Sequence, residues 1–191
     1  MSTGLQPTKA VPTAAPTAAA AAAAAAAPSK PTGDESPFYS LPCQSLDGQD
    51  VDLHAYKGQV ILVVNMASKC GFTTQMTGLE AVYQQFKDEG FVVLGFPSDS
   101  FHQEHGSSEE IATVCHTKYQ CTFPVMHKVA VNGKDTDPVF AWLKRQKSHL
   151  WMSRIKWNFE KFLLDRQGHV VKRYASTTTP ESMAAEIKAM L

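Results

Sequence analysis

The sequence predicts an α/β fold in which a mixed central β-sheet lies between helices. Two continuous apolar runs rich in β-branched residues, at 60–65 and 91–96, have the composition of strands that are covered on both faces. A segment with helical spacing separates them, which is typical of a parallel crossover. Near the end of the chain, a turn at Gly168 between two apolar runs predicts an antiparallel hairpin.

The remaining elements follow from apolar spacing and from residues that start or end helices. The expected strands cover 60–65, 91–96, 123–131, 162–165 and 170–174. The expected helices cover 73–87, 111–119, 138–147 and 180–191. Ser107 and Ser108 followed by Glu109 and Glu110 favour the start of the second helix. Pro138 suits the first turn of the third.

Residues 1–36 differ in composition from the rest of the chain. They are rich in Ala, Pro and Thr, contain an unbroken alanine run at 18–27, and have Leu5 and Val11 as their large apolar residues. Such a segment buries too little surface to offset the entropy of ordering. We therefore expect a disordered tail, followed by one globular domain at 37–191. The tail lacks the features of a signal peptide or an arginine-rich presequence, so a cytoplasmic location is expected, with the mitochondrion as the alternative.

Charge and composition exclude several classes of function. The net charge is zero, with 18 basic and 18 acidic side chains, so nucleic acid is not an expected partner. No apolar run outside the alanine tract approaches the roughly 20 residues of a membrane span, and stable membrane insertion is not expected. Four cysteines are too few for a disulfide-stapled secreted scaffold. They suggest free thiols in a reducing compartment: Cys43, Cys70, Cys115 and Cys121.

Cys70 is the first candidate for chemistry. It follows the predicted strand at 60–65 and precedes the predicted helix at 73–87, and ligands of open α/β sheets bind at this edge. The free N–H groups and partial positive charge of a helix start stabilise a thiolate. Lys69 adds positive charge nearby, and Gly71 leaves space beside the sulfur. A cysteine buried as a small apolar residue is the alternative, and spacing alone does not decide between them.

Three neutral hydrogen-bond donors could accompany this sulfur. Trp157 offers an indole N–H, and Asn158 and Gln103 offer amides. Together they could hold a thiolate and stabilise the oxygen that leaves as a peroxide bond breaks. Taken singly, each has an ordinary alternative as a packing, turn or loop residue.

Cys115 is a candidate second thiol, which could condense with an oxidised Cys70 to give a disulfide that a reductant can open. Cys121 is an alternative partner. The spacing of Cys115, His116 and Cys121 is not that of a common zinc site, and neither a metal nor a cofactor is expected.

Six segments resemble the glutathione peroxidase family in its cysteine-containing form. They occur in the family's order and together span roughly residues 37 to 190. They are VNMASKCGFTTQ (64–75), GFPSDSFHQE (95–104), EEIATVC (109–115), TFPVM (122–126), VNGKDTDPVF (131–140) and IKWNFEKFLLDRQGHVVKRY (155–174).

This resemblance implies a thioredoxin-like fold and a thiol peroxidase. Its catalytic residues would be Cys70, which attacks the peroxide, with Gln103, Trp157 and Asn158. Cys115 resembles the resolving cysteine of fungal and plant-type members. The implied activity reduces hydrogen peroxide and organic hydroperoxides through a sulfenic acid and an intramolecular disulfide, in response to oxidative stress. Since a helix keeps two such cysteines too far apart to bond, local unwinding near Cys115 is expected.

The resemblance also implies partners. Thioredoxin is the expected reductant and glutathione the alternative. The chain is short between Lys147 and Ile155, which implies a monomer. A peroxide sensor that relays oxidation to a transcription regulator would use the same residues and is the alternative to an enzyme.

The sequence departs from the family pattern in the loop that carries Gln103. The family commonly reads FPCNQFG before HQE, whereas this chain has FPSDSF and one residue fewer. The family's QEPG is here the stretch from Gln103 to Gly106, with His105 in place of proline. Cys43 and Cys121 are not at catalytic positions of the family and are treated as incidental.

Overall fold

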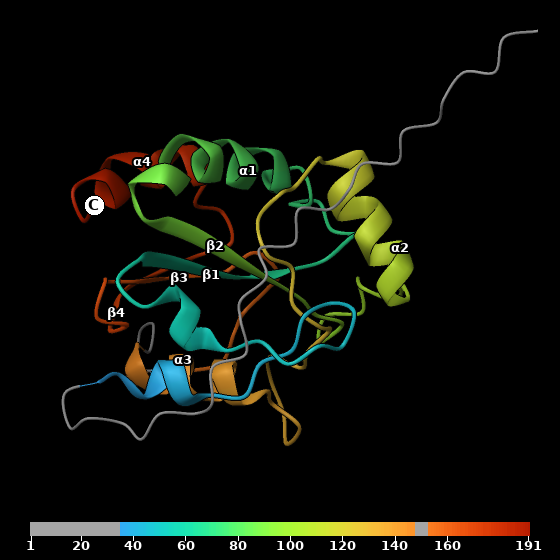
Figure 1. The fold of residues 1–191 in the computed structure, drawn as a ribbon. Coiled ribbons are helices and arrows are strands. Elements are labelled where there is room, and N and C mark those ends of the chain that lie inside the picture. Colours follow the sequence, from blue (N-terminus) through green and yellow to red (C-terminus); the bar gives the residue numbers. More distant parts are fainter. Residues whose placement is uncertain (1–34, 148–152) are drawn as a thin grey trace, which may run out of the picture.

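The computed structural model describes residues 35–147 and 153–191. Its central sheet has the strand order β2-β1-β3-β4 (Figure 1). The strands are β1 (Val60–Met66), β2 (Phe91–Pro97), β3 (Lys161–Leu164) and β4 (Val170–Tyr174). β1 and β2 are parallel, whereas β3 is antiparallel to both β1 and β4. The predicted mixed sheet and its terminal hairpin are therefore confirmed.

Helices cover both faces of the sheet. Figure 1 shows α1 and α4 side by side over one face and α3 under the other. The α-helices are α1 (Gln75–Phe86), α2 (Ser108–Ala112), α3 (Pro138–Gln146) and α4 (Pro180–Lys188). Short 3₁₀ turns lie at Pro37–Ser40, Leu53–Tyr56 and Lys87–Glu89. A π-helix, Thr113–Lys118, continues α2.

The two faces of β1 contribute to two separate apolar clusters, because successive side chains of a strand point to opposite faces. Ile61 and Val63 pack with residues of α3 such as Phe140. The other cluster contains residues of β1, α1 and α4, including Leu62 and Leu79. Every residue of β1 and β2 is buried, as the two apolar runs predict.

The strand expected at 123–131 is not formed. Isolated bridges, one of them between Val125 and Gly95 of β2, join this segment to its neighbours. Pro124 has no N–H to donate, and its carbonyl oxygen accepts from Gly95 N–H at 3.0 Å. The segment thus lies along β2 with intermittent hydrogen bonds and does not form a ladder.

The second helix begins as predicted but ends differently. The Ser107 hydroxyl and the Glu110 carboxylate form a reciprocal capping box. After Ala112, however, the helix widens into the π-helix that carries Cys115. π-Helical turns are rare and are frequent at functional sites.

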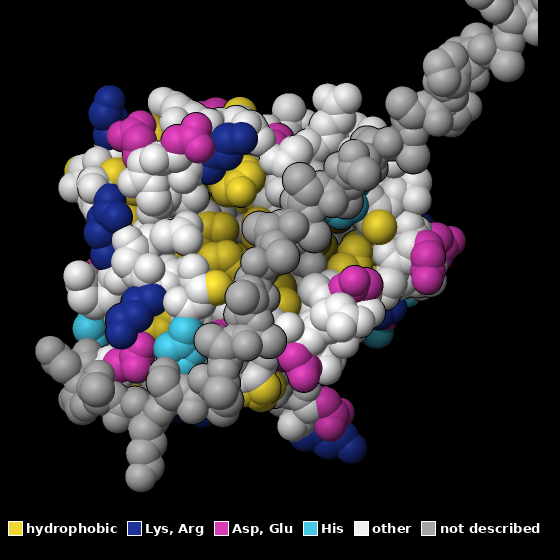
Figure 2. All heavy atoms as spheres, in the orientation of Figure 1, with side chains coloured by type: hydrophobic (Ala, Val, Ile, Leu, Met, Phe, Trp, Pro, Cys, Tyr) yellow, Lys and Arg dark blue, Asp and Glu magenta, His cyan; other side chains and the backbone are white. Residues whose placement is uncertain are grey.

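Most of the tail expected at 1–36 lies outside the described residues. At its end, the buried Ser36 hydroxyl donates to the Gly168 carbonyl oxygen at 2.8 Å. Gly168 has φ 81°, as the predicted hairpin turn requires. In the part of the chain that the structure describes, no helix has the length and apolarity to cross a membrane. Side chains of both charges are interspersed around the face shown in Figure 2.

A buried ion pair fixes the segment that precedes β3. Nε of Arg173, in β4, donates to Oε2 of Glu160 at 2.8 Å, and both side chains are almost fully excluded from solvent. The same guanidinium also donates to three carbonyl oxygens, those of Lys147, Ser153 and Arg154. One side chain therefore ties these three residues to the sheet.

Replacing Glu160 by alanine is expected to lower the free energy of unfolding by about 3–5 kcal/mol, because the Arg173 guanidinium would stay buried without its counter-charge. Urea or thermal unfolding measures this loss. Lys172→Ala is the control, since it breaks an ion pair with Glu186 whose side chains are 48% and 40% exposed. Such a pair contributes less than about 1 kcal/mol, so equal losses in the two variants would contradict the assignment.

Candidate active site

Three segments far apart in the sequence meet at one edge of the sheet. β1 leads into the Cys70 loop, and parallel β2 leads into the loop that carries Gln103, so both loops leave from carboxyl ends. β3 is antiparallel to β1, and the segment before it, with Trp157 and Asn158, therefore arrives at the same edge. The topology thus brings the four predicted site residues to one region.

Cys70 is half-buried in a tight turn after β1. Its Sγ accepts a hydrogen bond from Phe72 N–H at 3.4 Å. Its own N–H donates to Oγ1 of Thr73 at 3.0 Å. The Thr73 hydroxyl also lies 2.8 Å from the Ala67 carbonyl oxygen and 2.7 Å from that of Cys70. One buried hydroxyl therefore closes the loop that presents the sulfur.

The spacing predicts a helix that begins at Thr73, whereas α1 begins at Gln75. Thr73 uses its hydroxyl to bind nearby backbone, which competes with regular helix. The chain is nevertheless coiled from Cys70 onward, because Thr73 N–H donates to Cys70 O and Met76 N–H donates to Thr73 O, each at 3.0 Å. The N–H that reaches the sulfur comes from this turn.

Gln103 and Asn158 are in direct contact. Nδ2 of Asn158, which is fully buried, donates to Oε1 of Gln103 at 2.9 Å. The contact occupies the oxygen end of the Gln103 amide, so its NH₂ end is the one left to donate. The Gln103 carbonyl oxygen accepts from Lys69 N–H at 3.1 Å. The shortened loop thus still delivers Gln103 beside the Cys70 segment.

Trp157 is the most exposed of these residues, at 40%. Its ring packs at a tilt on Phe101, with 5.1 Å between ring centroids. Phe101 belongs to the same loop as Gln103, so this contact and the Gln103–Asn158 hydrogen bond join the two loops side by side.

Asn65, at the end of β1, is a site residue that sequence reasoning missed. Its Nδ2 donates to the Trp157 carbonyl oxygen at 3.2 Å, and its own carbonyl oxygen accepts from Phe159 N–H at 2.7 Å. Asn65 thus fixes both sides of Asn158. A polar residue at the end of an otherwise apolar strand was the available signal.

Glu104 is a second missed residue. It is 1% exposed, and its Oε2 accepts from both the backbone N–H and the hydroxyl of Ser68, each at 2.7 Å. Glu104 N–H in turn donates to Oδ1 of Asp99 at 3.1 Å. A carboxylate of the Gln103 loop therefore holds the loop that leads to Cys70. Glu104 is part of the family pattern HQE, but no rule based on residue spacing predicts its role.

Lys161 of β3 is buried, whereas Lys69 is exposed and its charge is solvated. Nζ of Lys161 donates to Oε1 of Gln75 at 2.5 Å and to the Thr178 carbonyl oxygen at 2.6 Å. Burial lowers the pKa of Lys161 to about 8. The start of α1 therefore holds a buried lysine that sequence analysis did not single out.

Comparison with known proteins identifies the family. The family model for glutathione peroxidase matches residues 38–144. The chain is also 53% identical, over 157 residues, to the glutathione peroxidase-like peroxiredoxin gpx1 of Schizosaccharomyces pombe, a match that covers 82% of this chain and 99% of that protein. The chain belongs to the glutathione peroxidase family. It is therefore a peroxidase, as the resemblance of its motifs implies.

Solved structures agree with this family. The fold is similar to the crystal structure of Trgpx in its apo form, with a TM-score of 0.66, 44% identity, and coverage of 80% of this chain and 94% of that one. A thioredoxin-family thiol:disulfide interchange protein from Chlorobium tepidum matches with a TM-score of 0.61 and 13% identity, over 78% of this chain and 91% of that one. The predicted thioredoxin-like fold is confirmed.

The cysteines of this glutathione peroxidase family member differ sharply in burial. All four are free thiols, and Cys70 alone is not buried. Burial raises the pKa of Cys43, Cys115 and Cys121 to about 12 in each case. Cys70 packs against the apolar cluster that contains Cys115. Among the described residues, no group of three or more His, Cys, Asp or Glu side chains could hold a metal ion.

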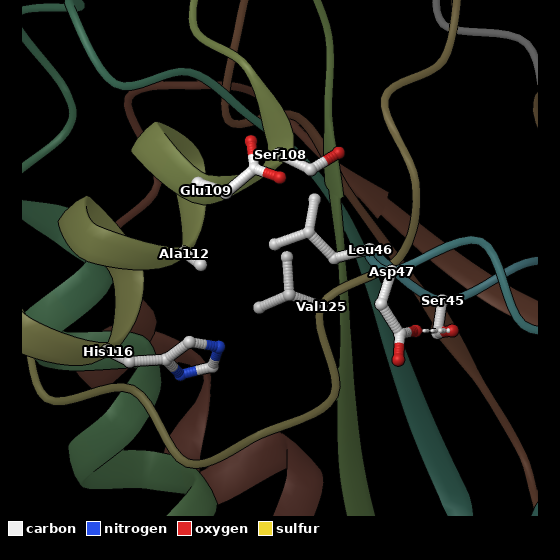
Figure 3. Close-up of a pocket in the computed structure, with 8 residues that line it drawn as sticks. All are labelled: Ser45, Leu46, Asp47, Ser108, Glu109, Ala112, His116 and Val125. Carbon is white, nitrogen blue, oxygen red and sulfur yellow. Dashed lines mark hydrogen bonds between the residues drawn. The ribbon is translucent and has the colours of Figure 1, made fainter.

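A hollow of about 350 Å³ borders the helix that carries Cys115. In Figure 3, Leu46 and Val125 face Ala112 across it, and His116 of the π-helix lies at its rim. None of the four predicted catalytic residues lines this hollow. It therefore lies beside the helix that carries the second thiol and is separate from the Cys70 site.

At pH 8 in the folded protein, Cys70 is expected to be the one thiol that reacts rapidly with a chromogenic disulfide reagent, because the other three thiols are buried and their raised pKa keeps them protonated. The three buried thiols should react after unfolding in urea. Their folded pKa lies above the unfolded value, so they cost no stability below about pH 8.5, and the free energy of unfolding should fall as the pH rises from there toward 12. Two or more fast thiols at pH 8 would contradict this burial.

Thr73→Val is expected to slow alkylation of Cys70 and peroxide turnover, because Cys70 N–H loses its acceptor and the turn around the sulfur relaxes. An unmet buried hydrogen bond also costs about 1–3 kcal/mol of stability. Thr74→Val is the matched control, since Thr74 is exposed and makes no capping hydrogen bond. Rates of Cys70 alkylation measured across pH would be the same in both variants if the Thr73 hydroxyl had no positioning role.

Proposed function

We propose that Cys70 reduces hydrogen peroxide and organic hydroperoxides, with Gln103, Trp157 and Asn158 as its donor residues and Cys115 as the resolving thiol. The observation that carries this proposal is the convergence of a half-exposed sulfur with the hydrogen-bonded Gln103–Asn158 pair at one sheet edge.

The first step is a displacement at oxygen. The Cys70 thiolate attacks one peroxide oxygen and the O–O bond breaks, which leaves a sulfenic acid on Cys70 and an alkoxide or hydroxide that takes up a proton. Phe72 N–H, at 3.4 Å from the sulfur, already donates toward it. The attack therefore starts from a sulfur that its own turn helps to hold.

The departing oxygen needs donors at the moment it gains charge. The NH₂ end of Gln103 is left to donate because Asn158 occupies its carbonyl oxygen. The exposed Trp157 indole offers a second N–H. These donors are neutral, so no uncompensated charge is buried while the site waits for peroxide.

The second step forms a disulfide. The Cys115 sulfur attacks the sulfenic acid of Cys70 and water leaves. Cys115 is fully buried and its thiol has a pKa of about 12, so the π-helix must open before it can react. The hollow beside Ala112 and His116 gives that helix space to move. This supports the local unwinding expected near Cys115.

The reductant we propose is thioredoxin, with glutathione as the competitor. A protein dithiol opens an intramolecular disulfide by two successive exchanges and needs no third thiol. The family relative from S. pombe is itself named a peroxiredoxin, which favours an enzyme over a sensor. We further propose that the chain acts as a monomer in a reducing compartment, the cytoplasm, with the mitochondrion as the alternative.

Steady-state peroxide reduction with thioredoxin and with glutathione, compared side by side, tests this function. Wild type should turn over faster with thioredoxin. Cys70→Ser should lose turnover with both reductants, and Cys115→Ser should lose at least about tenfold with thioredoxin, because no disulfide forms for exchange. Full thioredoxin-dependent turnover by Cys115→Ser would show that Cys115 is not the resolving thiol.

A further inference from the structure

Cys121 has no part in the function proposed above, yet the fold places it against Cys115. Cys121 N–H donates to the Cys115 carbonyl oxygen at 2.9 Å. Covalent geometry holds each Cα close to its bonded group: about 2.4 Å from the carbonyl oxygen and about 1.5 Å from the nitrogen. The two Cα atoms are therefore at most about 6.8 Å apart, within the ~7 Å that a disulfide can span.

The π-helix creates this proximity. At its end, Tyr119 N–H donates to the Val114 carbonyl oxygen at 3.1 Å, and Gln120 turns the chain back with φ 55°. Cys121 follows Gln120, and the reversed chain brings its backbone next to that of Cys115. Nδ1 of His116 also lies 2.8 Å from the Cys121 carbonyl oxygen. Two hydrogen bonds thus fix the pair.

The side chains of both cysteines enter one apolar cluster. Cys115 is 0% exposed and Cys121 is 2% exposed. Burial raises the pKa of Cys121 most, and the neighbouring Cys115 raises it further. Cys121 Sγ lies 4.0 Å from the Met76 carbonyl oxygen, in the first turn of α1. Cys70, just before that helix, packs against the same cluster.

We propose that Cys121 is a third redox-active thiol, which removes Cys115 from the Cys70–Cys115 disulfide. The Cys121 sulfur attacks the Cys115 sulfur, a Cys115–Cys121 bond forms, the Cys70–Cys115 bond breaks, and Cys70 leaves as a thiolate while the Cys121 proton goes to solvent. The exchange requires no further oxidant or reductant. It rests on the proposed function, which supplies the first disulfide.

The fold favours this direction of exchange. Cys115 lies 45 positions beyond Cys70 and six before Cys121, and a bridge across the shorter span closes a smaller loop. A Cys70–Cys115 bridge requires the π-helix to stay open, whereas Cys115 and Cys121 are already within bridging distance in the closed helix. Exchange thus lets the helix reform and leaves Cys70 free for another peroxide.

The reduced full-length chain, titrated with hydrogen peroxide in the absence of any reductant, tests the exchange. Peroxide consumed per chain is counted, remaining thiols are alkylated, and tryptic peptides are mapped without reduction. Trypsin cuts after Lys118, between the two cysteines, so a Cys115–Cys121 bridge appears as a linked peptide pair. Wild type should contain this pair after one equivalent, with Cys70 alkylated, and should consume two equivalents in all.

Cys121→Ser should keep the Cys70–Cys115 bridge and stop after one equivalent, a twofold reduction. Cys43→Ser is the matched control, since Cys43 is another buried thiol without a neighbouring cysteine, and should behave as wild type. If Cys121→Ser does not fold, Cys121→Ala replaces it. The disulfide map of the wild-type chain also tests the exchange without any variant.

A wild-type chain that stops at one equivalent with Cys70–Cys115 as its bridge would overturn the exchange and leave the proposed function intact. A Cys70–Cys121 bridge would likewise overturn it. Peroxide consumption that is unchanged in Cys70→Ser would instead refute the proposed function itself. The two failures are therefore distinguishable in one experiment.

Discussion

The antiparallel pairing of β3 with β1 is the constraint on which the site depends. Beyond the last paired residues of these strands, Asn65 N–H still bonds to the Glu160 carbonyl oxygen at 3.4 Å, and Phe159 N–H to Asn65 at 2.7 Å. This continued pairing delivers Trp157 and Asn158 to the carboxyl end of β1. A parallel β3 would have placed them at the opposite edge, far from the Cys70 loop.

Two strained residues flank the amide pair at the centre of the site. His102 precedes Gln103 with φ 56°, and Phe159 follows Asn158 with φ 64°. Left-handed backbone at a residue with a side chain costs about 1–2 kcal/mol, so the surroundings must offset it. Asn65 does so for Phe159, and the internal bonds of the Gln103 loop do so for His102, whose N–H donates to the Asp99 carbonyl oxygen at 2.9 Å. The strain is located where two amides must meet.

The features that could be predicted from the sequence are those that a local pattern of residues encodes. The apolar runs at 60–65 and 91–96 gave both buried strands, because burial on two faces requires nearly every residue to be apolar. The motif resemblance predicted the family, which the comparisons confirm, and four site residues, which the strand pairing brings to one edge of the sheet. The strand at 123–131 was predicted wrongly. Its composition is apolar, but Pro124 has no backbone N–H to donate and interrupts the ladder.

The parts that were missed depend on contacts between distant residues. Asn65 and Glu104 act through bonds to Trp157 and Ser68, which lie 92 and 36 positions away, and no periodicity encodes such pairs. The π-helix likewise follows from the way its C-terminal turn closes, where Gln120 reverses the chain, and intrinsic propensity at single positions does not specify it.

Burial gives the cysteines an order of action. Cys70 is accessible, and the other three thiols are kept protonated by an apolar environment that disfavours charge. In the proposed cycle, oxidation therefore begins at Cys70, and Cys115 can join only when its helix opens. The closed π-helix holds the backbones of Cys115 and Cys121 together, so in the proposed exchange the transfer of Cys115 from Cys70 to Cys121 and the reclosure of that helix form one step.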